Sequence, residues 1–321
     1  MLYNRTAYAI RQQAGGEADI LSSLAPYIQV WQVDHVPVKM AAEPGRCDTD
    51  HLRTTPGLYP DLLTPLREDR RLMLCENLES LYFELDGKGE IPAGEYTVTV
   101  TLNDEATGEA VDTASVLLTV IDAELPAQEI IVTQWLHCDC LQTYYHTESF
   151  DRCHWEIIEK FIKTAVEHGI NMMLTPVFTP PLDTYIGGQR PTTQLVDVTV
   201  ENGQYRFGFD KLARWVDLCD RLGVKYFEIS HFFTQWGAGH APKVMATVDG
   251  TYQQLFGWET DATGPEYIRF LRVFIPQLLS FMRSKNGADK RCWFHISDEP
   301  TLGHLPQYAA SRAAIADLLE G

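Results

Sequence analysis

Residues 1–122 contain short runs in which apolar and polar side chains alternate, separated by turn-forming residues. A period of two is typical of strands that bury one face. It predicts strands at residues 27–33, 71–74, 80–85, 92–102 and 114–121. Residues 44–67 are rich in proline, glycine and aspartate and are expected to form a long irregular loop. Together these features predict a β-sandwich-like N-terminal domain over residues 1–122.

The pattern changes after a linker at residues 123–128. Apolar strands at residues 129–136, 171–178, 225–231 and 291–297 alternate with helical patterns at residues 155–168, 211–222, 265–284 and 305–319. Gly169 and Gly223 follow two of these helices, where glycine is a common terminator. Residues 193–209 are expected to form an inserted hairpin with Asn202-Gly203 at its tip.

Four consecutive strand–helix units predict a parallel sheet with right-handed crossovers. A closed (β/α)8 barrel has eight such units in about 250 residues. We therefore expect an all-β domain followed by an α/β region, residues 129–321, that forms the N-terminal half of a TIM-type barrel. A smaller open α/β domain is the alternative. The half-barrel interpretation also predicts that the chain is truncated at its C-terminus and clipped at its start.

Composition and charge narrow the class of partner. The 321 residues are 45% hydrophobic and 11% aromatic, as in a packed globular protein. A net charge of −18 disfavours nucleic acids and anionic membranes, which need a basic face. Residues 1–10 lack the apolar segment of a signal peptide, and no apolar run reaches membrane-spanning length. Seven scattered cysteines favour reduced thiols, so a cytoplasmic protein without membrane insertion is expected.

The most distinctive polar group follows the fourth predicted strand. Asp298 and Glu299 are adjacent carboxylates, and Pro300 is expected to keep Glu299 extended and to end the strand. The chemistry of a (β/α)8 barrel is located at the carboxyl ends of its strands, which favours a catalytic pair. The alternative is that Asp298 caps the following helix.

Histidine, tryptophan and acidic side chains follow the other predicted strands as well. Indole faces stack on sugar rings, and polar groups bind the sugar hydroxyls. The candidates for substrate binding are His137, Asp139, His231, Trp236, His240 and, on the fourth strand, His295. Core packing is the alternative for His295 and is favoured for Phe232 and Phe233. Cys138-Asp139-Cys140 lacks a second thiol pair at zinc spacing, so no metal site is predicted.

Five segments together resemble the catalytic domain of glycoside hydrolase family 123. They are residues 134–141, 174–184, 231–242, 256–262 and 294–300. The resemblance extends from residue 129 to the end and, more weakly, over the β-rich part. It implies a β-N-acetylgalactosaminidase that acts on glycosphingolipid-type glycans without a metal or an organic cofactor. It also adds Trp258, in the fourth segment, to the expected substrate-binding residues.

The resemblance further implies a retaining, exo-acting and substrate-assisted reaction on a glycan or glycoside with a terminal N-acetylhexosamine. Glu299 would protonate the leaving oxygen and then deprotonate water. Asp298 would hold the 2-acetamido group for attack on the anomeric carbon. Two alternatives stay open: a conventional retaining glycosidase with its nucleophile in the missing half, and a non-catalytic carbohydrate-binding remnant. The sequence decides neither galacto against gluco substrates nor the oligomeric state, nor whether this chain is active alone.

Overall fold

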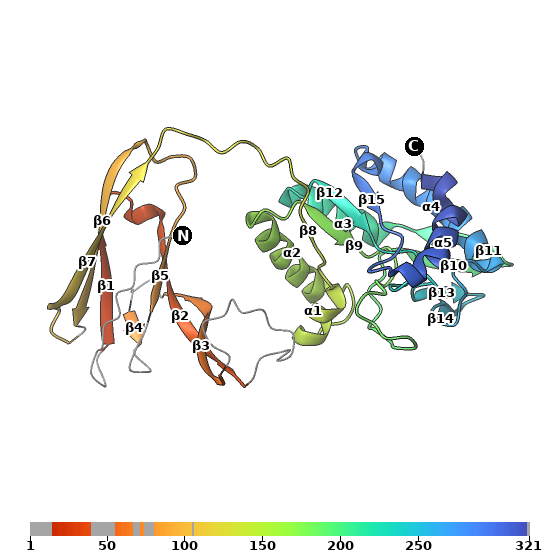
Figure 1. Ribbon diagram of the computed structural model, residues 1–321, viewed down its shortest axis with the longest axis horizontal. Coiled ribbons are helices and arrows are strands. Elements are labelled where there is room, and N and C mark those ends of the chain that lie inside the picture. The colour runs from red at the N-terminus through yellow and green to blue at the C-terminus, as the bar shows by residue number, and fades with distance from the viewer. Residues whose placement is uncertain (1–14, 40–54, 67–70, 74–79, 105, 320–321) are drawn as a thin grey trace. The chain divides into compact units, whose positions relative to one another are not determined.

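The computed structural model describes residues 15–39, 55–66, 71–73, 80–104 and 106–319. The chain divides into two compact units, Met1–Pro126 and Ala127–Gly321. Each unit has its own sheets, and all five α-helices of the described residues belong to the second unit (Figure 1). None of the described helices is both long enough and apolar enough to cross a membrane.

The N-terminal unit consists of antiparallel strands in two sheets (Figure 1). The four-stranded sheet has the order β4-β1-β6-β7, with β1 (Gly15–Leu21), β4 (Arg71–Met73), β6 (Gly94–Asp104) and β7 (Ala110–Val120). The three-stranded sheet has the order β3-β2-β5, with β2 (Ile28–Val38), β3 (Gly57–Pro65) and β5 (Leu81–Leu85). Among the described residues, the buried apolar side chains here are Leu24, Val30 and Val98, so the packed core of a sandwich stays a prediction.

One expectation for this unit is wrong. Residues 57–65, assigned to an irregular loop, form β3 and pair with β2. Pro60 and Pro65 hide the strand pattern, but β3 lies at the edge of its sheet, where one side of the backbone is unpaired and proline is tolerated. The register also shifts between Asp34 and His35, which accommodates the irregular sequence. Residues 44–54 of the predicted loop lie outside the described residues.

The C-terminal unit contains a four-stranded parallel sheet with the order β15-β12-β9-β8. Its strands are β8 (Thr133–Gln134), β9 (Met172–Thr175), β12 (Tyr226–Ile229) and β15 (Cys292–Phe294). The helices α2 (Arg152–Glu167), α3 (Asp210–Leu222), α4 (Pro265–Ser284) and α5 (Leu305–Leu319) follow them in turn. The mixed α/β architecture predicted for this region is therefore present. Because strands that are consecutive in this series are neighbours in the sheet, their carboxyl ends lie along one edge.

A second sheet in this unit, with the order β11-β10-β13-β14, contains two hairpins. β10 (Asp197–Glu201) and β11 (Gln204–Gly208) form the predicted one, and Asn202 and Gly203 have positive φ at its turn. β13 (Val244–Val248) and β14 (Thr251–Phe256) form a hairpin absent from the sequence-based prediction, although Asp249-Gly250 is a similar turn signal. Helix α1 (Cys138–Tyr145) is also absent from that prediction, since no side chain caps its first turn.

The helices pack on the parallel sheet through one apolar face each. The fully buried Trp215 indole of α3 donates from Nε1 to the Thr175 Oγ1 of β9 over 3.2 Å, which fixes this helix on the sheet. Gly223 ends α3 with a φ of 92°, a conformation that residues with a Cβ rarely adopt. Helix α5 is less deeply packed, because its buried side chains are Ser311 and Ile315 alone.

Aromatic rings fill the core between the two sheets and α4. Phe270 and Phe274 stack with ring centroids 5.9 Å apart, and the Phe274 ring lies 4.6 Å from that of Phe178. Phe232 and Phe233 are also buried, which confirms the core assignment made for them. Ring pairs of this kind add about 0.5–1.5 kcal/mol each to the stabilisation from burial.

Replacing Phe274 with alanine should destabilise the C-terminal unit by about 3–5 kcal/mol, because a buried ring is lost and a cavity remains. Val273→Ala is the matched control on the same helix, since Val273 is 37% exposed, and it should cost about 0.5 kcal/mol. Urea unfolding followed by tryptophan fluorescence measures both variants. Equal destabilisation by the two would contradict the assigned core.

Candidate active site

The segment after β15 carries the two predicted catalytic carboxylates. Asp298 is half-buried and Glu299 is exposed. β15 ends at Phe294, before the predicted end at Ser297. Glu299 has a φ of 45°, so the expectation that Pro300 keeps it extended is wrong. A non-glycine residue in this left-handed region costs about 1–3 kcal/mol and persists only where its surroundings fix it.

The alternative role for Asp298, as a helix cap, does not hold. The next helical turn is a 3₁₀ turn at Leu302–His304, and its N-cap is Thr301. The Thr301 and His304 side chains form a reciprocal capping pair there. The Asp298 carboxylate is therefore not used to start the following helix.

Hydrogen bonds to the loop after β12 hold the acid segment in place. Ser297 is buried, and its hydroxyl donates to the Thr234 carbonyl oxygen over 2.9 Å. The Trp236 amide donates to the Asp298 carbonyl oxygen over 3.0 Å, and the Gly237 amide donates to Ser297 Oγ over 3.4 Å. Trp236 and Gly237 both have positive φ, which turns their consecutive amides toward the acid segment. These contacts are the surroundings that fix the left-handed backbone.

The environment of Asp298 disfavours its charged form. Burial raises the pKa of Asp298, and the neighbouring Glu299 carboxylate raises it further. Asp183, in the loop after β9, acts in the same direction, while the charge on His295 lowers the pKa. Asp183 Oδ2 itself lies 3.6 Å from the Nε2 of His137. Ionisable groups from the ends of β9 and β15 therefore act on this carboxyl.

Glu228, His231 and His295 form a polar cluster at the ends of β12 and β15. His231 Nε2 and His295 Nδ1 are 2.7 Å apart, and His295 Nδ1 lies 3.7 Å from Glu228 Oε1. Burial lowers the pKa of His231 to about 3, with the charge on His295 acting in the same direction, so this ring is neutral near pH 7. One donor atom from each residue lies within 4.8 Å of the others. Two imidazoles and a carboxylate can bind a proton or a transition-metal ion.

Glu228 is a functional candidate that the sequence pattern does not reveal. It is only 6% exposed on a strand that is otherwise apolar at its buried positions. Thr133 Oγ1 donates to its carboxylate over 2.9 Å, and Trp135 Nε1 donates to both carboxylate oxygens over 3.0 Å. An acid inside an apolar strand was the available signal, because a buried charge needs partners.

Asp139 is occupied by an ion pair. Arg190 donates from Nε to Asp139 Oδ2 over 2.7 Å and from Nη2 to Oδ1 over 3.0 Å. The two side chains are 14% and 5% exposed, respectively. The Arg190 carbonyl oxygen in turn accepts a hydrogen bond from Lys243 Nζ over 2.9 Å. Asp139 therefore anchors the loop after β9, and its two oxygens are already bonded.

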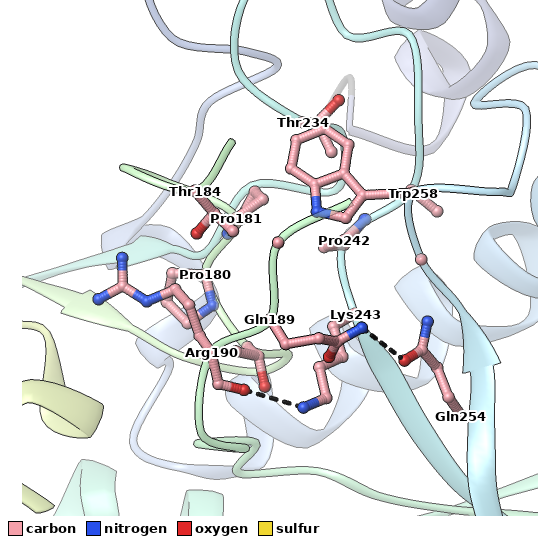
Figure 2. Close-up of a pocket in the computed structure, with 14 residues that line it drawn as sticks. Pro180, Pro181, Thr184, Gln189, Arg190, Thr234, Pro242, Lys243, Gln254 and Trp258 are labelled. Carbon is pink, nitrogen blue, oxygen red and sulfur yellow. Dashed lines mark hydrogen bonds between the residues drawn. The ribbon is translucent and has the colours of Figure 1, made fainter. Parts of the chain in front are cut away.

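A small open recess lies beside this loop (Figure 2). The side chains that line it include an indole, an ammonium group, amides and hydroxyls, from Trp258, Lys243, Gln189, Gln254, Thr184 and Thr234. His240 packs edge-on against Trp258, with ring centroids 5.8 Å apart, and its amide donates to Thr234 Oγ1 over 3.3 Å. Figure 2 shows the Gln189–Gln254 hydrogen bond across the lower side of the recess.

The predicted site residues thus fall into two groups and one exception. One group lies at the acid segment: Trp236 donates to the Asp298 carbonyl oxygen, and His231 pairs with His295 just before Asp298 and Glu299. His137 lies beside Asp183 in the loop after β9. Trp258 lines the recess and His240 packs against Trp258, and the recess shares Thr234 with the loop that holds the acid segment. Asp139 is the exception, because it lies in the buried ion pair.

Replacing Arg190 with alanine should leave the Asp139 carboxylate buried without its partner. Removing one member of a buried pair costs about 3–5 kcal/mol. Arg221→Ala is the matched control, because the Arg221–Glu159 pair is solvent-exposed on both sides, and such pairs contribute about 0–1 kcal/mol. Chemical unfolding of the two variants measures the difference. Comparable losses would show that the Asp139–Arg190 pair does not anchor the loop.

Comparison with known proteins identifies a matching family model and similar solved structures. Residues 135–321 match the family model described as glycoside hydrolase 123, catalytic domain. A comparison with curated proteins gives no match. Among solved structures, the chain resembles a family 123 glycoside hydrolase from Clostridium perfringens whose structural analysis addresses glycolipid glycan hydrolysis. The TM-score is 0.64 at 11% sequence identity, over 95% of this chain and 53% of that chain.

At this identity the structural match shows a shared fold, and the chain spans about half the length of the structure that it matches. The family match rests on the sequence itself. It covers more than half of the chain and includes all the predicted site residues, from His137 to Glu299. The chain therefore belongs to glycoside hydrolase family 123, with the catalytic-domain segment at residues 135–321.

Proposed function

We propose that this chain carries the catalytic acids of a retaining exo-β-N-acetylhexosaminidase that acts on β-N-acetylgalactosaminides by substrate-assisted catalysis. The observation that supports this most is the position of Asp298 and Glu299, adjacent to each other just beyond the carboxyl end of β15. Two acids on one segment suit a reaction whose nucleophile belongs to the substrate, because no enzyme carboxylate is then needed on the opposite face of the sugar. The glycolipid glycans associated with the Clostridium perfringens enzyme support a glycan substrate.

In the first step, ionised Asp298 accepts a hydrogen bond from the N–H of the 2-acetamido group and orients that group. The acetamido carbonyl oxygen attacks the anomeric carbon while the bond to the leaving oxygen breaks. Glu299 gives its proton to the leaving oxygen, so the leaving group departs as an alcohol. The Asp298 carboxylate also compensates the positive charge that develops on the cyclic intermediate.

In the second step, water attacks the anomeric carbon and the bond to the acetamido oxygen breaks. Glu299, now ionised, takes the proton from that water, which restores both the acid and the acetamido group. Two displacements at one carbon retain its configuration. The exposed position of Glu299 suits both roles, because the leaving group and the water must each reach it.

The surrounding residues have distinct roles in this proposal. Trp236 is 46% exposed next to the acid segment, so its indole is available to stack on a sugar ring. His137 and His295 offer ring nitrogens to the sugar hydroxyls, whereas buried His231 acts through His295. Trp258 binds beyond the terminal sugar, at the recess (Figure 2), and His240 supports the Trp258 ring from the side. Asp139 positions a loop instead of touching the substrate.

The architecture that we propose for this function is the N-terminal half of a (β/α)8 barrel over residues 129–321, after a sandwich-like domain over residues 1–122. The parallel order β8-β9-β12-β15 supports this, because it matches four consecutive strand–helix units.

Asp298→Asn and Glu299→Gln should each lower kcat on an aryl β-N-acetylgalactosaminide by about 10²–10⁴-fold, the usual contribution of a positioned acid or base. The loss in Glu299→Gln should grow as the leaving phenol becomes more basic, because Glu299 protonates the leaving oxygen. The loss in Asp298→Asn should stay nearly constant across the same series. Glu167→Gln, exposed on α2, is the control. Unchanged turnover in either acid variant would refute the assigned roles.

An inhibitor separates this mechanism from its alternatives. A thiazoline that mimics the cyclised acetamido group should inhibit competitively, because it resembles the intermediate. Activity that is insensitive to the thiazoline points to a conventional retaining glycosidase with a separate nucleophile. Saturable binding of N-acetylgalactosamine without any turnover points to a carbohydrate-binding remnant.

The acidic limb of the pH profile should lie above the range of an ordinary aspartate. Asp298 must be ionised to hold the acetamido group, and its pKa is raised by burial and by Glu299. Activity is therefore lost as the pH falls through this raised pKa, above the usual value of about 3.9. The dependence of kcat/KM on pH reports the free enzyme. A limb at or below the usual value would contradict this assignment.

A further inference from the structure

Lys243 differs from the other half-buried cations of the C-terminal unit. In the described part of this unit, those cations each pair with a carboxylate: Arg190 with Asp139, Lys211 with Asp197, Lys285 with Asp217 and Arg291 with Asp220. Lys243 is half-buried too, yet it forms no ion pair with any described residue. Its Nζ donates to the uncharged Arg190 carbonyl oxygen over 2.9 Å. Because an ammonium group has three N–H donors, further donors of Lys243 are left without a partner among these residues.

The recess that Lys243 lines contains no negative charge to compensate for it (Figure 2). None of the 14 described residues around the recess is acidic, although the whole chain has a net charge of −18. The other cation there, Arg190, is already neutralised by Asp139. Burial lowers the pKa of Lys243, whereas a neighbouring carboxylate would raise it. The recess therefore holds a positive charge that the described residues do not balance.

Uncharged N–H donors accompany this cation. Trp258 and Gln254 line the same recess, and neither Trp258 Nε1 nor Gln254 Nε2 donates a hydrogen bond to a described residue. An oxyanion with several acceptor oxygens matches such a set of donors, and hydrogen bonds to a charged group are the stronger kind. The recess is small, so it suits a single carboxylate or sulfate group and not a whole sugar ring.

Thr234 connects the recess to the acid segment. It lines the recess, and its carbonyl oxygen accepts the hydrogen bond from the Ser297 hydroxyl over 2.9 Å. Ser297 directly precedes Asp298 in the chain. The recess is therefore next to the position proposed for the terminal sugar, and the following sugar can present a substituent to Lys243.

We propose that the recess binds an anionic group, a carboxylate or a sulfate ester, on the sugar that follows the terminal N-acetylhexosamine, with Lys243 as its counter-charge. The inference rests on the proposed function for the position of the terminal sugar, and it assigns acidic oligosaccharides as the preferred substrate class. Lys243 can keep its bond to the Arg190 carbonyl oxygen while its other N–H groups bind the anion.

Matched disaccharides test the preference. One has a terminal β-N-acetylgalactosaminyl residue on galacturonic acid, and its methyl ester has nearly the same shape without the charge. In about 0.15 M salt, repulsion from acidic side chains more than about 8 Å away is screened. The parent should show a kcat/KM about 10–100-fold higher for the acid, the usual effect of hydrogen bonds to a charged group.

A second pair, with galactose 6-sulfate or plain galactose in place of the uronic acid, separates a sulfate from a carboxylate. Preference for the charged member of either pair supports the proposal and identifies the anion. Equal kcat/KM values within both pairs would overturn it.

Lys243→Met should abolish this preference, because methionine has a similar length and no charge. Lys243→Arg should retain part of it, since the cation is kept. Lys160→Met, exposed on α2, is the matched control and should leave the preference as in the parent. If Lys243 only anchors the Arg190 loop, Lys243→Met would lower kcat/KM equally for the acid and the ester. Such an equal loss would overturn the anionic site.

Binding without turnover separates this inference from the proposed function. Calorimetric titration of the acid and the ester into the Glu299→Gln chain, with and without Lys243→Met, should show tighter binding of the acid only where Lys243 is present. If the parent hydrolyses none of the disaccharides but this selectivity appears, the proposed function fails and the anionic site stands. If the parent hydrolyses the neutral disaccharides and neither binds nor cleaves the acidic ones better, the function stands and the anionic site is refuted.

Discussion

Parallel pairing of β12 with both β9 and β15 is the constraint on which the site depends. In this register Glu228 of β12 pairs with Leu174 of β9 and with Trp293 of β15. The three strands therefore end at nearly the same height along the sheet. The residues that follow β12 can then contact groups on either side. On one side of β12, the Trp236 amide in the following loop donates to the Asp298 carbonyl oxygen. On the other side, the Glu228 carboxylate of β12 accepts a hydrogen bond from Trp135. A change of register here would separate the acid segment from the loops that hold it.

The site uses two kinds of basic partner for its buried carboxylates, histidine and arginine. Neighbouring imidazoles act to lower the pKa of both Glu228 and Asp298. Arg190, by contrast, forms an ion pair with Asp139. Imidazoles can gain or lose a proton in the pH range where an enzyme operates, and guanidinium groups cannot. A site built in this way remains adjustable in charge. The ion pair at Asp139 has the opposite property and keeps a loop in one arrangement.

Local sequence patterns were sufficient for the four strand–helix units of the C-terminal unit and for the position of the acid pair after the fourth strand. They were insufficient wherever a contact joins distant positions. Glu228 is held by Thr133, and Asp139 by Arg190, and nothing near either acid in the sequence indicates its partner. The prediction of an extended backbone at Glu299 is wrong for the same reason, because tertiary hydrogen bonds override the local preference imposed by Pro300. The strand β3 was hidden by prolines that an edge position tolerates.

The chain of contacts from Asp139 through Arg190 to Lys243 has a consequence for how this site can be altered. Asp139 belongs to the segment after β8, Arg190 to the loop after β9, and Lys243 to the approach to β13. Three surface segments are therefore mechanically joined beside the recess. Replacing one of these segments with that of a relative would remove one partner of each interaction and leave a charged group without its counterpart. Engineers who wish to reshape this surface should exchange the three segments as one cassette, and natural variation here is expected to be correlated.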